Sequence, residues 1–390
     1  MGARGIGVLR GLGKSSVIAV DVGAAGVRAC QLRRRNGRLQ LWERLSHERV
    51  EPAETVEANL PELDCAWLGR FIGRGDFRGR EMALVLSPPE VQFYPMRLPP
   101  ALLAQPRERI EQALKCEVAQ ESRQSAELEV RFWPLPNGRG QQPNVMAAAT
   151  PAEAAAHWCD LAEGCGFYLR RIDVSPCALV ALACRTAPPA AGEIWGVLDL
   201  GLRHSILTVV IGSVPAYVRV LSVSAHDWTC ELARAFEIDY AAAEQVKREY
   251  GVGTLASGVP WPAGPPAGEM RGAARPAAGT LLNAADLPTA VSTALRRSLR
   301  TLAHEVGRCF SYVVQNYPDL VLSRLFLAGG GAASVGLAAA LEAALDMPVR
   351  VISADPGRAA ANGHDSENPA EAAPAFAAAM GAALLDLENS

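Results

Sequence analysis

Two short stretches of the chain decide its fold, Val17-Ile-Ala-Val-Asp-Val-Gly23 and Trp195-Gly-Val-Leu-Asp-Leu-Gly201. Each is an apolar run typical of a buried strand, and each ends in Asp-x-Gly. A second strand and a return strand follow both stretches, and the first hairpin turns at Asn36-Gly37, a dipeptide that favours a tight turn. The repeated order of strand, Asp-x-Gly and hairpin predicts a duplicated α/β domain.

The composition is that of a globular protein with two or more domains, since 49% of the 390 residues are hydrophobic and the mean hydropathy is +0.08. A formal net charge of -3 argues against nucleic-acid binding. Nine cysteines, none in a CxxC pair, are typical of a reducing cytoplasm. No apolar run is long enough to span a membrane, so we expect a cytoplasmic protein that reaches the membrane only through a partner.

The domain boundaries follow from changes in pattern. An extended, Pro-bounded stretch and an amphipathic helix over 107–120 interrupt the first domain as a small insert, and a Pro/Gly/Ala-rich segment interrupts the second. We predict a flexible N-terminal tail at 1–16, a first domain at 17–190 with an inserted subdomain at about 89–144, and a second domain at 191–388 with a helical subdomain at about 226–322 and a mobile loop at 258–279.

The two Asp-x-Gly sequences, Asp21-Val-Gly23 and Asp199-Leu-Gly201, predict a nucleotide cleft between the domains. Glycine loops let backbone N–H groups approach phosphate oxygens, and two carboxylates can hold a hydrated Mg²⁺ that neutralises the phosphates. A single Asp-x-Gly is more often an ordinary strand-to-turn aspartate. The prediction therefore rests on the pair.

Two further motifs fit such a cleft. Leu327-Ala-Gly-Gly-Gly-Ala332 is a strand that ends in three glycines, whose backbone can pass close to a flat base; the alternative is a flexible turn. Glu244 and Lys247 lie at i and i+3 on one helix face, within reach of each other or of a ribose; the alternative is a surface ion pair.

Taken in order, these motifs resemble the actin and FtsA superfamily of ribonuclease H-like folds, and most closely the PilM family of type IV pilus assembly proteins. Three features carry the closer resemblance: the helix end Ala243-Glu-Gln-Val-Lys247-Arg-Glu-Tyr-Gly251, the segment Leu327-Ala-Gly-Gly-Gly-Ala-Ala-Ser-Val-Gly-Leu337, and Leu98-Pro in the insert. The likeness extends from residue 17 to about residue 385.

The resemblance implies ATP and Mg²⁺ as cofactors, with Asp21 and Asp199 acting on the metal through water. It implies that the following residues surround the nucleotide: Asp21, Gly23, Ala24, Ala25 and Arg28 at the first phosphate loop, Asp199, Gly201 and Ser205 at the second, Glu244 and Lys247 at the ribose and base, and Gly329, Gly330 and Gly331 beside the adenine.

Several positions depart from the family pattern. Ala24 and Ala25 stand where hydroxyl residues are usual, so phosphate contacts are lost. Ala225-His-Asp-Trp228 replaces a Gly-Gly turn, and Asp227 near a phosphate would be repulsive, although Thr229 is retained. We expect weak nucleotide binding, and hydrolysis that is slow or absent.

The function implied by the resemblance is that of a cytoplasmic adaptor that docks the N-terminal tail of a PilN-type inner-membrane protein, with the insert as contact surface. It also implies contact with the pilus motor ATPase and allows self-association. Alternatives are a small-molecule kinase, for which no clear general base is present, and an FtsA-like division anchor, which would end in a basic amphipathic helix. A type II secretion relative with its own membrane span is disfavoured, and service in DNA uptake or secretion stays open.

Signals outside the cleft are weaker. The six histidines include no His-x-x-x-His pair, so they predict no metal site. Arg33-Arg-Arg35, beside the first hairpin turn, can contact an acidic tail or lipid headgroups. A solvated turn is the interpretation that the sequence favours.

Overall fold

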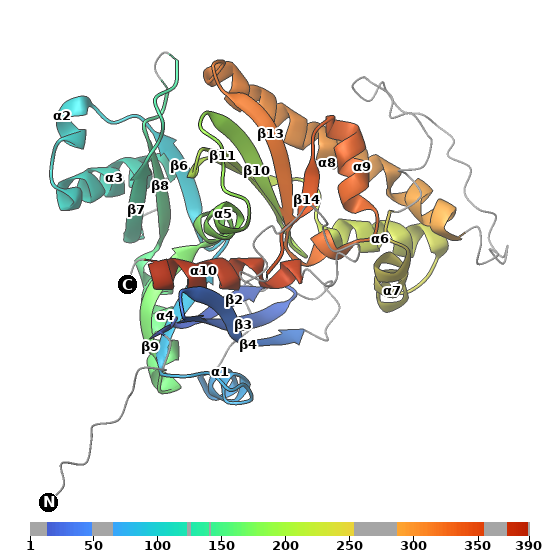
Figure 1. Ribbon diagram of the computed structural model, residues 1–390, viewed down its shortest axis with the longest axis horizontal. Coiled ribbons are helices and arrows are strands. Elements are labelled where there is room, and N and C mark those ends of the chain that lie inside the picture. Colours follow the sequence, from blue (N-terminus) through green and yellow to red (C-terminus); the bar gives the residue numbers. More distant parts are fainter. Residues whose placement is uncertain are drawn as a thin grey trace, which may run out of the picture.

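The computed structural model describes residues 14–48, 65–122, 126–139, 142–252, 287–354 and 373–388. The mobile loop predicted at 258–279 lies outside these residues, as do residues 1–13 of the predicted tail. The described chain forms two large sheets, a smaller third sheet, and helices between and around them (Figure 1).

The first sheet confirms the hairpin at its start. Its strands are β1 (Lys14–Ser15), β2 (Ile18–Gly23), β3 (Gly26–Arg35), β4 (Arg38–Glu48), β5 (Glu81–Leu86) and β9 (Tyr168–Val174), in the order β1-β3-β2-β5-β9 with β4 on β3. Asn36 and Gly37 both have positive φ, as a tight hairpin turn requires. The predicted tail of 1–16 is too long, because β1 pairs with β3 and the buried Ser16 hydroxyl accepts from Leu32 N at 3.0 Å.

The second sheet has the same topology as the first, which confirms the duplication. It consists of β10 (Glu193–Leu200), β11 (Ser205–Ile211), β12 (Val214–Leu221), β13 (Val321–Ala328) and β14 (Val349–Val351), in the order β12-β11-β10-β13-β14. In each sheet the Asp-bearing strand pairs with an antiparallel hairpin on one side and a parallel strand on the other.

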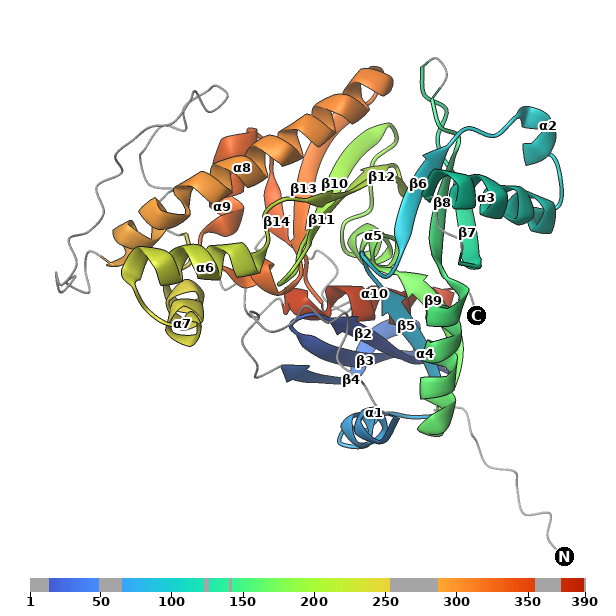
Figure 2. The ribbon, with the colours of Figure 1, turned by 180° about the vertical axis from the view of Figure 1, so that it is seen from behind.

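Two helices, α5 (Ser175–Thr186) and α10 (Ala377–Glu388), fill the space between the sheets (Figures 1 and 2). Gly381 lets them touch, because a Cβ at this position would lie 1.9 Å from the carbonyl oxygen of Ala178. α10 packs on β2, β3 and β5, and Val17 N donates to Asp386 Oδ2 at 3.0 Å. The predicted second domain of 191–388 is therefore wrong at its end, since the last helix lies on the first sheet.

Helices also cover the outer faces of both sheets. α1 (Cys65–Ile72) and α4 (Ala152–Gly164) flank the first sheet, and α6 (Ala225–Phe236), α7 (Tyr240–Tyr250), α8 (Leu287–Asn316), the turn η3 (Gly330–Ala333) and α9 (Leu337–Leu345) lie on the side of the second. A short turn, η4 (Pro374–Phe376), precedes α10. α6 and α7 lie within the region predicted as a helical subdomain at about 226–322. α6 begins at Ala225, because Ser224 and Asp227 form a capping box.

The insert folds as a separate antiparallel sheet in the order β6-β8-β7, formed by β6 (Gln92–Met96), β7 (Leu128–Pro134) and β8 (Val145–Pro151). α2 (Pro100–Leu103) and α3 (Arg107–Ser122) complete it, and Ile110, Leu114 and Val118 of α3 are buried as the helical period predicts. Because β8 is the central strand, the predicted end at about 144 is one strand too early. Within the described residues, no helix combines the length and apolarity needed to cross a bilayer.

Candidate functional site

The two aspartates of the Asp-x-Gly sequences face each other across the space between the sheets. Val20 and Val22 of β2 point into the outer core of the first domain, so Asp21 between them points to the opposite face. Leu198 and Leu200 of β10 lie in the outer core of the second domain, so Asp199 also points inward. Neither carboxylate makes a hydrogen bond or ion pair with the described residues.

The two carboxylates and Arg28 influence one another's charge. Burial raises the pKa of Asp21 to about 6, against the opposing charge of Arg28. Burial and the negative charge of Asp21 raise the pKa of Asp199, Arg28 opposes them, and the pKa is about 7. Arg28 pairs directly with Asp21 across β2 and β3, so both side chains share a face. The pair of carboxylates is therefore short of positive charge, a state that a bound cation would relieve.

Glycine is required at two places around this pair. Gly26 has φ +143°, and a Cβ there would lie 2.0 Å from the carbonyl oxygen of His47. Gly329 has φ +80°, and a Cβ would lie 2.4 Å from Asp199 Oδ1. By contrast, a Cβ on Gly330 would meet nothing within 4 Å, so this turn is open on the outside. Backbone, rather than side chains, thus lines the cleft next to Asp199.

The turn of Ala24 and Ala25 and the loop after Asp199 offer few polar groups. Ala24 and Ala25 form the two-residue turn between β2 and β3 and carry no hydroxyl, so only their backbone can contact a ligand. Gly201 N donates to the carbonyl oxygen of His204 at 3.1 Å. That donor is therefore already used.

Ser205 is turned away from the cleft. It is fully buried and pairs directly with Leu200, whose side chain lies in the outer core, so the serine faces that core. Its hydroxyl has no hydrogen-bond partner among the described residues. The geometry does not support the phosphate contact that the family resemblance implied for this residue.

The N-terminus of α6, where a phosphate would otherwise find free N–H groups, is closed by the chain itself. Ala225 N donates to the Gly201 carbonyl at 3.1 Å, and His226 N donates to the Leu202 carbonyl at 2.9 Å. Asp227 Oδ2 accepts from Ser224 N at 2.8 Å. The aspartate thus caps its own helix, and its charge occupies the helix end that would attract an anion.

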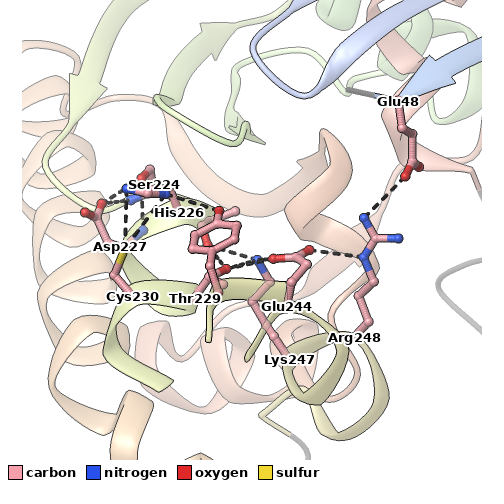
Figure 3. Close-up of polar contacts among 11 residues, drawn as sticks. Glu48, Ser224, His226, Asp227, Thr229, Cys230, Glu244, Lys247 and Arg248 are labelled. Atoms are coloured by element: carbon pink, nitrogen blue, oxygen red, sulfur yellow. Dashed lines mark hydrogen bonds and ion pairs between the residues drawn. The ribbon is translucent and has the colours of Figure 1, made fainter. Parts of the chain in front are cut away.

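Glu244 and Lys247 form the expected ion pair, at 2.6 Å, but within a closed network (Figure 3). The Lys247 ammonium also donates to Thr229 Oγ1 at 2.6 Å and to the Ala225 carbonyl at 2.9 Å, so all three of its N–H groups are used. Burial lowers the pKa of Lys247, and Glu244 opposes that shift. Lys247 joins α7 to α6 and has no donor left for a nucleotide.

Glu244 remains accessible from the other side. Its Oε1 accepts from Arg248 Nε at 3.1 Å. Burial raises the pKa of this carboxyl, but the charge of Lys247 and the hydrogen bonds from Lys247, Thr229 and Arg248 together lower it below its usual value. Glu244 and Arg248 line an open groove of about 460 Å³ on α7. This groove is where a ribose could meet the Glu244 carboxylate.

An ion pair that the sequence did not predict joins the first domain to the second, between the end of β4 and α7. Arg248 Nη2 lies 3.4 Å from Glu48 Oε2, at the end of β4, across 200 positions of sequence (Figure 3). Glu48 pairs with Gly26, the glycine that follows the Ala24-Ala25 turn. No local pattern marks such a pair, because it depends on how the domains are oriented.

The duplicated sheets around two facing aspartates define an actin-like fold. Over 95% of this chain and 98% of the other, it is similar to a chain of the solved structure "PilM-PilN type IV pilus biogenesis complex", with 24% identity and a TM-score of 0.71. More distant similarity is found to ethanolamine utilization protein EutJ from Carboxydothermus hydrogenoformans, at 14% identity and a TM-score of 0.46 over 95% of this chain and 89% of that one. No protein-family model and no curated protein matches the chain.

The residues of the cleft fit a magnesium nucleotide in part. The unpartnered carboxylates of Asp21 and Asp199 are suited to water ligands of Mg²⁺, and Arg28 adds a positive charge beside them. The open turn at Gly330 leaves room at the backbone. The hydroxyl of Ser205 and the ammonium of Lys247 are directed elsewhere. A nucleotide would therefore be held mostly by backbone, metal and one arginine.

Proposed function

We propose that this protein is an actin-like, nucleotide-binding adaptor of type IV pilus assembly, or of a related DNA-uptake or secretion system. The observation that carries the proposal is the likeness to the PilM-PilN complex, which includes both large sheets and the insert at nearly full length. The proposal includes a cytoplasmic location at the inner membrane, reached through a partner, and contact with the pilus motor ATPase.

The partner we propose is the N-terminal cytoplasmic tail of a PilN-type inner-membrane protein. The insert supports this, since its β6 and β7 each pair on one side only among the described strands, and a free strand edge can accept an extended peptide. Trp133 on β7 donates from Nε1 to the Pro215 carbonyl at 2.8 Å, so the insert also touches the second domain. A peptide bound there would respond to the relative position of the domains.

We propose ATP with Mg²⁺ as the ligand of the cleft. Asp21 and Asp199 would hold the metal through water, and the cation would neutralise phosphate charge there. Arg28 would add positive charge, the backbone around Gly23 would contact the phosphates, and the backbone of Gly329 to Gly331 would lie beside the adenine. Because side-chain hydroxyls and free ammonium groups are few, the nucleotide acts in this proposal as a ligand that favours a closed cleft rather than as a substrate for rapid turnover.

The test combines the two ligands. Calorimetric titration is carried out with a peptide of the PilN-type tail encoded in the same genome, and separately with Mg²⁺ and a non-hydrolysable ATP analogue. Asp199→Asn is compared with Asp160→Asn, an exposed carboxylate on α4. We expect both ligands to bind the wild type and only the nucleotide to be lost in Asp199→Asn. A failure of the peptide to bind, or phosphorylation of a small molecule by the purified protein, would overturn the adaptor proposal.

A further inference from the structure

Positive charge is concentrated at one end of the first sheet. Residues 1–42 contain eight basic residues and a single acidic one, although the whole chain has a formal net charge of -3. Six basic side chains gather around the β3–β4 hairpin and are called here the basic hairpin surface; four of them are exposed, and Arg33 and Arg34 are partly buried: Lys14, Arg33, Arg34, Arg35, Arg38 and Arg78. The cleft residues described above are not among them.

The strand register opposes like charges on this surface. Lys14 pairs directly with Arg34 between β1 and β3, and Arg35 pairs directly with Arg38 at the hairpin. Like charges directly opposite each other destabilise a sheet. None of the six takes part in an ion pair within the part of the chain that the structure describes. The nearby carboxylate of Glu43 accepts backbone N–H groups instead, so the positive charge is not neutralised by the fold.

Neighbouring side chains hold two of these arginines, Arg33 and Arg78, in place. The guanidinium groups of Arg33 and Arg78 lie over the ring of Trp42, at 4.5 and 3.9 Å from its centroid. Gln31 fixes the loop that carries Arg78, since its amide accepts from Arg78 N at 2.8 Å and donates to Arg78 O at 2.7 Å. Arg78 is therefore held beside the hairpin although it is distant in sequence.

The tip of the hairpin is hollowed. A cavity of about 480 Å³ is lined by Arg35, Asn36, Arg38 and Gln40. Two guanidinium groups and two amides around an open cavity suit a phosphate group, because arginine forms paired hydrogen bonds with phosphate oxygens.

We propose that the basic hairpin surface binds the phosphate headgroups of an anionic lipid bilayer. The basic groups are spread over β1, the tip of the β3–β4 hairpin and the loop of Arg78, and such a spread of charge matches many headgroups on a plane better than one acidic peptide. This contact goes beyond the proposed adaptor function, since it needs neither nucleotide nor partner protein. It would orient the first domain toward the membrane.

The test is co-sedimentation of the full chain with vesicles of equal parts phosphatidylglycerol and phosphatidylethanolamine, and with phosphatidylcholine vesicles. The hairpin variant carries Arg34→Gln, Arg35→Gln and Arg38→Gln. The matched control removes the same charge from exposed positions on α6 and α8, as Arg234→Gln, Arg297→Gln and Arg308→Gln. Each basic residue near a membrane surface contributes about fivefold to the binding affinity. The hairpin variant, which lacks three of them, should therefore bind the anionic vesicles about a hundredfold more weakly than the wild type, and the control should lose much less affinity.

Several outcomes would overturn the proposal. The proposal fails if the hairpin variant and the control bind the anionic vesicles equally well. It also fails if the wild type binds phosphatidylcholine vesicles as tightly as the anionic ones, or if it binds polyglutamate but no vesicles. Full displacement by inorganic phosphate would assign the cavity to a soluble phosphate instead of a bilayer. Thermal unfolding checks the fold: because both like-charge pairs, Lys14 with Arg34 and Arg35 with Arg38, are removed, the hairpin variant should be at least as stable as the wild type.

Discussion

The aspartate pair makes a quantitative prediction for Asp199→Asn in the absence of nucleotide. The carboxyl of Asp199 has a pKa of about 7, against 3.8 for the free group, because burial and the charge of Asp21 both disfavour its ionisation. Asparagine has nearly the same shape and does not ionise. The substitution should therefore remove an electrostatic cost that the wild-type protein carries at neutral and alkaline pH.

The magnitude follows from proton linkage. Since the folded-state pKa of Asp199 is raised, the folded protein binds more protons than the unfolded chain between about pH 4 and pH 7, and its free energy of unfolding falls as pH rises through this window. A shift of about three pKa units corresponds to roughly 4 kcal/mol as an upper value. Between about pH 5 and pH 8 the wild type should lose about 2 to 3 kcal/mol relative to Asp199→Asn.

The assay is urea unfolding followed by circular dichroism at a series of pH values, with Asp160→Asn as the control for loss of an exposed carboxylate. The urea midpoint of Asp199→Asn should exceed that of the wild type at about pH 8 and approach it at about pH 5. Mg²⁺ with an ATP analogue should raise the midpoint of the wild type only. Parallel pH profiles for the wild type and Asp199→Asn would refute the inference that the two aspartates share a buried cleft.

Three further predictions concern stability, each measured by the same urea unfolding. Lys247→Met should cost about 3 kcal/mol, because it breaks a buried ion pair and leaves three acceptors without their donor; a loss below about 1 kcal/mol would contradict the network. Gly26→Ala should cost more than about 2 kcal/mol through its clash with β4, whereas Gly330→Ala, with open space around it, should change stability by less than about 1 kcal/mol. Gly381→Ala should push α10 away from α5 and lower the free energy of unfolding by about 3 kcal/mol. Its control, Gly307→Ala in α8, should raise the free energy of unfolding by about 0.5 to 1 kcal/mol. Equal effects of the two substitutions would show that α5 and α10 are not in close contact.

Local patterns predicted much of the architecture. The two apolar strands, the Asn36-Gly37 turn, the helix over 107–120 and the helix that carries Glu244 are confirmed, because each depends on residues that are neighbours in sequence. The ion pair of Glu244 with Lys247 is also confirmed, since the i, i+3 spacing places both on one helix face. The boundaries were less predictable. β8 belongs to the sheet of the insert, and α10 packs on the first sheet. The residues of a strand or helix do not by themselves show which distant element it will contact.

The candidate site divides in the same way. The sequence predicted Asp21, Asp199 and Gly329 as cleft residues. The strand register explains why Gly329 lies beside Asp199 and why both aspartates point away from the outer cores. It did not predict that Ser205 faces the outer core, because whether a strand residue points inward depends on its cross-strand partner. The nucleotide roles inferred for the remaining residues stay predictions.

By itself the sequence determined which strands are buried, where the chain turns, and that two aspartates end equivalent strands of a duplicated domain, because these properties arise from local polarity and backbone preference. Only the tertiary structure decided which polar groups remain available. The ammonium of Lys247 and the first N–H groups of α6 are used within the protein, whereas the carboxylates of Asp21 and Asp199 and the guanidinium groups of Arg34, Arg35 and Arg38 make no hydrogen bond or ion pair within the part of the chain that the structure describes. Hydrogen bonds form between groups that packing brings within about 3 Å, and sequence distance does not measure that proximity.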